Sequence, residues 1–149
     1  MMNALFDPIK GYANWALRIS FAATFLFHGW DKVASWSAGP GASFPSMMSG
    51  FGEPTLMGYA LAGLVTFAEL AAGLGILAGI FLGSTITRLS GLAVIPVMLG
   101  AIFMVHLPSG FNNVNMGPDG FGMPGWEFNL ALLAMGVFFL IAGNNDSEA

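Results

Sequence analysis

Four apolar stretches, at about residues 12–32, 56–82, 86–107 and 126–142, constrain the fold of this chain most. A helix needs about 20 mostly apolar residues to cross the roughly 30 Å hydrocarbon core of a bilayer. Only 8% of the 149 residues are charged and 56% are hydrophobic, which nearly excludes a water-solvated fold. The sequence therefore predicts one all-α domain over residues 1–149, an antiparallel bundle of four transmembrane helices.

Two longer loops, residues 33–55 and 108–125, are rich in Gly, Pro and Ser but also carry aromatic residues. We expect them to fold over one mouth of the bundle, because aromatic side chains on free loops are poorly soluble. An even number of spans puts both termini on one side together with Lys10 and Arg88, and puts Lys32 on the opposite side. The positive-inside rule then favours cytoplasmic termini, with both long loops on the outer face.

The charge and the cysteine count exclude several classes of function. Four Lys and Arg against eight Asp and Glu give a net charge of −4 with no basic run, so nucleic acid is not an expected partner. The sequence has no cysteine, which removes disulfides, thiolate metal sites, iron–sulfur clusters and dithiol redox cycles. A redox role would therefore need electrons from a partner protein, a bound cofactor or a reducing substrate.

Two charges, Arg18 and Glu69, fall inside the predicted spans away from the span ends, where each costs roughly 3 kcal/mol to insert. Counted from residue 12, Arg18 lies about 9 Å into its span, and Glu69 lies near the middle of the next span. Two interpretations stay open. Arg18 and Glu69 form an intramembrane ion pair, or Arg18 extends to the cytoplasmic headgroups and Glu69 is protonated.

Small residues recur every four positions at the end of the second span, at Gly75, Gly79 and Gly83. Such spacing lets helix backbones approach closely in lipid, although a Gly-rich span also meets the pattern by chance. The Gly-Ser-Thr turn that follows predicts a tight hairpin between the second and third spans.

Three further titratable residues of the spans gather at the outer side of the bundle. His28 lies near the outer end of the first span, His106 at the outer end of the third, and Glu127 opens the fourth. Reduction of a membrane quinone needs proton donors near its carbonyl oxygens, stabilisation of developing negative charge and an apolar slot for the ring. We therefore predict a quinone site with these three residues as catalytic proton donors. The predicted substrate-binding residues are Lys32, Trp30 and Trp126.

Each of these residues also has a purely structural interpretation, because His and Glu at helix ends often hydrogen-bond loop backbone. Two histidines at similar depth could also bind the iron of a b-type haem as its two axial ligands. This cofactor is disfavoured, since span topology alone brings many His pairs to equal depth. No metal site is predicted, because the cluster offers too few ligands.

The order of motifs resembles the DoxX-like family of small four-helix membrane proteins. The segment ALRISFAATFLFHGWDKV is similar to the family's opening pattern, an Arg and an apolar run followed by His-Gly-x-x-Lys, here Arg18, His28, Gly29 and Lys32. Further similar segments are FPSMMSGFGEP, GLGILAGIFLGSTITR and VHLPSGF. The loop NNVNMGPDGFGMPG is longer than the family pattern.

The resemblance implies a protein of the bacterial inner membrane, and some relatives are membrane subunits of thiosulfate:quinone oxidoreductase. We therefore expect an integral membrane subunit of a quinone-linked redox complex, with quinone as substrate or bound ligand. Its expected partners are the lipid bilayer and other protein subunits. The alternative is a non-catalytic accessory or structural subunit of a larger respiratory or photosynthetic complex. A small-solute transporter fits less well, because few polar residues offer a path through the inner leaflet.

Overall fold

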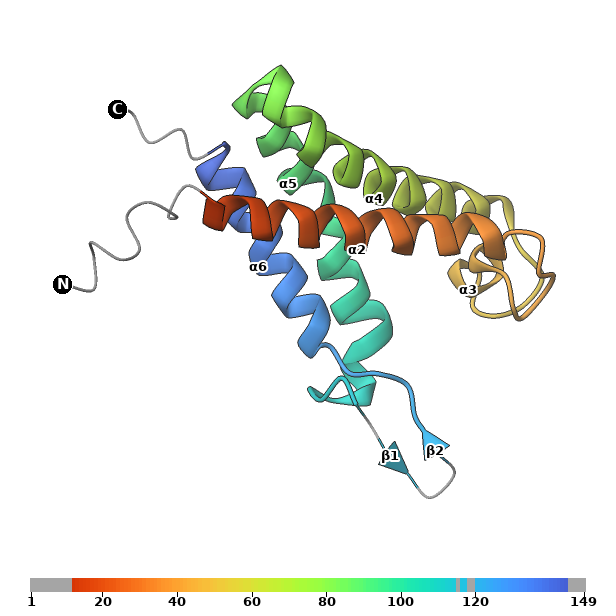
Figure 1. Ribbon diagram of the computed structural model, residues 1–149. Helices are drawn as coiled ribbons and strands as arrows, with labels where there is room; N and C mark the ends of the chain where they lie inside the picture. Colours follow the sequence, from red (N-terminus) through yellow and green to blue (C-terminus); the bar gives the residue numbers. More distant parts are fainter. Residues whose placement is uncertain (1–11, 115, 118–119, 145–149) are drawn as a thin grey trace.

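The computed structural model describes residues 12–114, 116–117 and 120–144, and four long helices dominate this part of the chain (Figure 1). They are α2 (Ala13–Ser35), α4 (Leu56–Leu82), α5 (Ser84–Gly100) and α6 (Glu127–Ala142). Helix α5 continues through a π-helical segment, Ala101–His106, and a 3₁₀ turn, Leu107–Ser109. The smaller elements are α3 (Phe44–Met48) and an antiparallel pair of two-residue strands, β1 (Met116–Gly117) and β2 (Gly120–Phe121). The predicted helical fold is confirmed.

The observed helix limits lie close to the predicted ones. Helix α4 has the predicted limits, and the predicted spans 12–32 and 126–142 correspond to α2 and α6. The third predicted span, 86–107, corresponds to the continuous helical stretch Ser84–Ser109. Helix α2 runs three residues further than predicted, to Ser35, whose hydroxyl donates to the Lys32 carbonyl oxygen at 2.8 Å.

Two of the helical stretches are long and apolar enough to cross a membrane, Leu56–Leu82 and Ser84–Ser109, and each reaches a mean hydropathy of 2.0. Helix α6 is apolar but has 16 residues, and α2 has 23 residues with a more polar composition. Large apolar side chains face outward, such as Phe67 and Phe81 of α4 at 71% and 87% exposure. An exposed apolar surface of this kind is typical of a helix that faces lipid.

The limits of the helices have local causes. The Thr55 hydroxyl accepts a hydrogen bond from the Gly58 N–H at 3.0 Å, which caps the start of α4. Gly83 joins α4 to α5 with a φ of 101°, in a region that favours glycine. Gly143 ends α6 in the same region, with a φ of 62°. Helices α4 and α5 therefore form the predicted tight hairpin.

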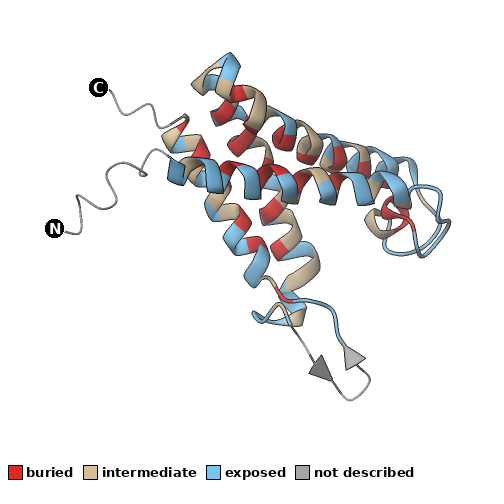
Figure 2. Cartoon of the chain, viewed as in Figure 1, coloured by how far each residue is buried: buried red, intermediate tan, exposed pale blue. Residues whose placement is uncertain are grey.

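The long helices meet at one end and diverge toward the other (Figure 1). They meet where α2 begins, where α4 turns into α5, and where α6 ends. Buried apolar residues of all four helices form the core, and Figure 2 shows buried positions on the faces that the helices turn toward one another. The Phe21 ring of α2, for example, packs against Phe139 of α6 with the ring centres 5.3 Å apart. Away from this end, α2 with α4 diverges from α5 with α6.

Glycines permit the close contact between α4 and α5. A Cβ atom on Gly79 would collide with Thr87 of α5, and one on Gly75 would collide with Ser90 of the same helix. Gly83, the third member of the small-residue pattern, lies in the connecting turn. The prediction that these glycines let two helix backbones approach closely is therefore confirmed at Gly75 and Gly79.

Candidate functional site

A cavity of about 640 Å³, here called the cleft, lies between the two diverging helix pairs. Its wall comes from α2, the segment around α3, α4, the end of α5 with the π-helical segment, and the start of α6. Most of the wall is apolar, and its polar side chains are His28, Asp31, Lys32, Ser35, Ser43, Glu69, His106 and Asn129. A concave, mainly apolar surface of this size with a few polar groups is typical of a small-molecule site.

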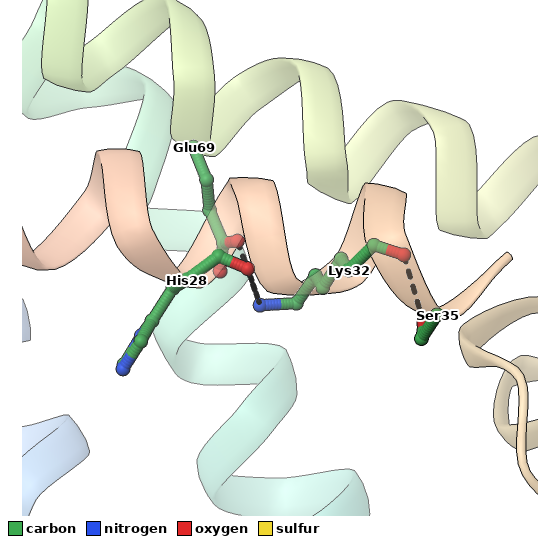
Figure 3. A network of polar contacts seen from close by, with 4 residues as sticks. All are labelled: His28, Lys32, Ser35 and Glu69. Atoms are coloured by element: carbon green, nitrogen blue, oxygen red, sulfur yellow. Dashed lines mark hydrogen bonds and ion pairs between the residues drawn. The ribbon is translucent and has the colours of Figure 1, made fainter.

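An ion pair between α2 and α4 forms one part of this wall (Figure 3). The Lys32 Nζ donates to Glu69 Oε2 at 2.7 Å, and the Glu69 side chain is 2% exposed. The ammonium also lies 5.3 Å from the centre of the Phe44 ring, in cation–π contact. Each charge compensates the other in an apolar setting, so removal of either partner would leave an uncompensated charge.

The predicted pair of Arg18 with Glu69 is wrong, because α2 and α4 meet in a different register. A Cβ atom on Gly29 of α2 would touch the Leu70 side chain of α4, so Glu69 lies level with the residues around Gly29. Arg18 precedes Gly29 by 11 residues, about 16 Å along the helix. Lys32 lies within one turn of Gly29, and its side chain therefore reaches Glu69.

Arg18 instead ties the long helices together where they meet. Its guanidinium donates to the Ile76 carbonyl oxygen of α4 at 2.8 Å and to the Thr87 hydroxyl of α5 at 3.2 Å. It also donates to the Gly143 carbonyl oxygen at 3.3 Å and to Asn144 Oδ1 at 2.8 Å, immediately after α6. The side chain is 3% exposed, so protein groups hold it and it does not extend to lipid headgroups.

His28 extends from α2 away from the Lys32–Glu69 pair (Figure 3) and lines the cleft. Its ring packs edge-on against Phe128 of α6, with the ring centres 6.0 Å apart. Neither ring nitrogen of His28 has a hydrogen-bond partner among the residues that the structure describes. Both nitrogens are therefore available to a ligand in the cleft.

His106 lines the cleft from the end of the π-helical segment. Such segments rotate the residues that follow and are frequent at functional sites. The Nδ1 atom of His106 lies 2.8 Å from the Pro124 carbonyl oxygen. Because a carbonyl oxygen only accepts, Nδ1 carries the proton of the neutral ring, which leaves Nε2 as a hydrogen-bond acceptor.

Backbone hydrogen bonds hold the Pro124 carbonyl in place. The Gly125 N–H donates to the Asn112 carbonyl at 3.0 Å, and the Trp126 N–H donates to the Gly110 carbonyl at 3.2 Å. A Cβ atom on Gly125 would lie 2.6 Å from the Asn112 carbonyl oxygen, so this approach requires glycine. The two ends of the loop are thereby joined, which fixes the partner of His106.

Three predicted site residues lie outside the cleft. Glu127 is exposed, and its carboxylate accepts a hydrogen bond from the Asn113 N–H at 3.0 Å. This contact matches the structural interpretation, in which an acid at a helix end binds loop backbone. The Trp126 ring packs against Phe111 with the ring centres 4.7 Å apart. Trp30 is 64% exposed on α2. The structure therefore brings together both histidines and the lysine of the predicted site, but neither Trp nor Glu127.

Two cleft residues were not assigned there from the sequence. From the sequence, Glu69 is placed near the middle of its span and paired with Arg18, whereas the structure pairs it with Lys32. Asn129 received no role, although a lone amide in the apolar run of α6 was a usable signal. It is 8% exposed, it lies on the inward face of α6, and it lines the cleft.

Comparison with known proteins identifies the family. The family model of DoxX matches residues 13–107, from the start of α2 through the π-helical segment. The chain belongs to the DoxX family. No curated protein and no solved structure gave a match. Together with the two long apolar helices, family membership makes this a membrane protein of the DoxX type. The segment that matches DoxX includes every polar cleft residue named above except Asn129.

Proposed function

We propose that this DoxX-family protein is the quinone-facing membrane subunit of a redox complex, and that the cleft is its quinone site. The observation that carries the proposal is the presence of His28 and His106 on the wall of one mainly apolar cleft. The two imidazoles come from different helix pairs, so a ligand that fills the cleft meets both. Imidazole is the side chain whose ordinary pKa suits proton exchange near neutral pH.

We further infer that all four long helices cross the bacterial inner membrane as an antiparallel bundle, with both termini in the cytoplasm. Outward-facing apolar side chains on α2 and α6, such as Phe27 and Ile141, support this arrangement. The long loops then lie on the outer face, and the cleft opens beside them. A quinone would reach the cleft from the outer half of the bilayer.

Reduction of a quinone to a quinol takes up two electrons and two protons. The imidazolium forms of His28 and His106 donate the protons to the carbonyl oxygens, and the Lys32 ammonium stabilises the negative charge that develops there. The chain has no cysteine to carry electrons, so we assign the electrons to a partner protein, a bound cofactor or a reducing substrate. In this proposal the chain supplies protons and another component supplies electrons, and the proposed role resembles that of a DoxX-type subunit of thiosulfate:quinone oxidoreductase.

The alternative is a non-catalytic accessory subunit of a larger respiratory or photosynthetic complex. This alternative is favoured because two polar residues of the predicted site make structural contacts. Lys32 pairs with Glu69, and the Glu127 carboxylate accepts a hydrogen bond from the Asn113 N–H of the loop. In that case a side chain of a neighbouring subunit fills the cleft. Gentle solubilisation, native gel separation and mass spectrometry of comigrating proteins identify the neighbours, and quinone binding by the purified protein separates the two functions.

Replacement of both histidines tests the quinone site. We expect the purified protein in lipid nanodiscs to bind a short-tailed benzoquinone or naphthoquinone above the background of empty nanodiscs. The double variant His28→Leu with His106→Leu should bind at least about tenfold more weakly, because it loses two hydrogen-bonding groups of the cleft. Equilibrium titration with quenching of tryptophan fluorescence measures both affinities.

Glu53→Gln is the matched control, because Glu53 is an exposed polar residue of the outer loop that does not line the cleft. Its affinity should stay within about twofold of the wild-type value. Binding no stronger than that of empty nanodiscs, with either quinone and with the wild-type protein, would refute the quinone site and leave the accessory function.

A further inference from the structure

Asn129 is an unusual residue for its position. It shares the inward face of α6 with Leu132, Gly136 and Phe139, which pack into the apolar core. It is 8% exposed, and the surface that remains faces the cleft that it lines. No hydrogen bond of its carboxamide is found within the described part of the chain.

The carboxamide nitrogen and oxygen are not among the fully enclosed polar atoms, so they keep contact with the cleft and can hydrogen-bond a molecule that occupies it. An apolar residue would be the better choice if this position served packing alone. Asn129 and His28 line the same cleft from different helices, so a ligand there contacts the wall that carries both side chains. The missing partner of Asn129 is therefore expected within the cleft.

We propose that Asn129 is a specificity-determining residue of the cleft, whose carboxamide hydrogen-bonds one oxygen of the quinone. The proposal deepens the proposed function and rests on it. The carboxamide nitrogen donates to the carbonyl oxygen of the oxidised ligand, and the carboxamide oxygen accepts from the hydroxyl group of the reduced ligand. One side chain thus serves both redox forms, and it selects ligands with an oxygen at this position over apolar rings.

Asn129→Leu tests this role with a readout that a packing residue would not change. A hydrogen-bonded quinone carbonyl absorbs at lower frequency than a free one, and infrared difference spectra with a ¹³C-labelled carbonyl resolve it. We expect the bound wild-type spectrum to show this downshift, and the variant to lose it for one carbonyl. The variant should bind the quinone about tenfold more weakly. Without quinone it should be at least as stable as the wild-type protein.

Thr66→Val is the matched control, because the Thr66 hydroxyl is a buried polar group without a partner among the described residues and lies outside the cleft. It should leave the affinity and the carbonyl band unchanged. An unchanged carbonyl band in Asn129→Leu, with quinone still bound, would overturn the role of Asn129 and leave the quinone site intact. Loss of stability in Asn129→Leu without ligand would show a structural role or a bridging water only. Absence of quinone binding by the wild-type protein would instead refute the proposed function.

Discussion

Removal of either member of the Lys32–Glu69 pair should lower the free energy of unfolding by about 3 kcal/mol, one of the two largest effects that we expect. The Nζ and Oε2 atoms lie 2.7 Å apart, and the Glu69 side chain is 2% exposed. Lys32→Met leaves the carboxylate without its cation, and Glu69→Leu leaves the ammonium without its anion. Unfolding of the detergent-solubilised variants by titration with a denaturing detergent measures the loss.

The double variant should recover most of this loss, because it buries apolar groups and leaves no unpaired charge. The coupling energy of the double-mutant cycle should therefore reach about 2 kcal/mol or more. Asp31→Asn is the control, since Asp31 is an exposed acid on the same turn and forms no ion pair with a described residue. If the single variants lose no more stability than this control, the ion pair does not exist in the folded protein.

Replacement of Arg18 should have a comparable effect through a different mechanism. Arg18→Met removes hydrogen bonds to α4, to α5 and to the segment after α6, and it leaves the acceptors buried. We expect a loss of about 3 kcal/mol in the free energy of unfolding. Arg18→Lys should recover only about half of it, because an ammonium cannot reproduce the planar fork of a guanidinium.

Arg88 provides the control for the general loss of an arginine. It lies near the same end of the bundle but is exposed, and its Nε is 3.5 Å from the Ser84 hydroxyl. Arg88→Met should change the free energy of unfolding by less than about 0.5 kcal/mol. Equal losses for Arg18→Met and Arg88→Met would show that Arg18 does not connect the helices.

The helices were predictable from the sequence because apolar runs between polar loops determine them almost completely. The limits of α4 agree residue for residue with the predicted span, since Thr55 caps its start and Gly83 ends it. The tight hairpin and the close contact at Gly79 follow from the same local chemistry. Family membership was predictable as well, because it depends on the order of motifs.

The pairing of charges was not predictable, because the depth of a residue in its own span does not define the register between two helices. That register depends on which side chains interlock, here Gly29 with Leu70 and Gly73 with Leu26. His28 and His106 line the same cleft, because both residues occupy the same end of their helical spans. Glu127 lies outside the cleft, because a carboxylate at the start of a helix is equally suited to bind loop backbone.

The most direct measurement of the central claim is photolabelling with an azido-substituted quinone, followed by proteolysis and mass spectrometry of the labelled peptides. Our account predicts labels on the three cleft segments, at residues 28–35, 96–106 and 123–129, and predicts that excess unmodified quinone suppresses them. The double variant of His28 and His106 should lose most of the labelling. Labels confined to the outward face of α4, unaffected by excess quinone, would contradict a quinone site in the cleft.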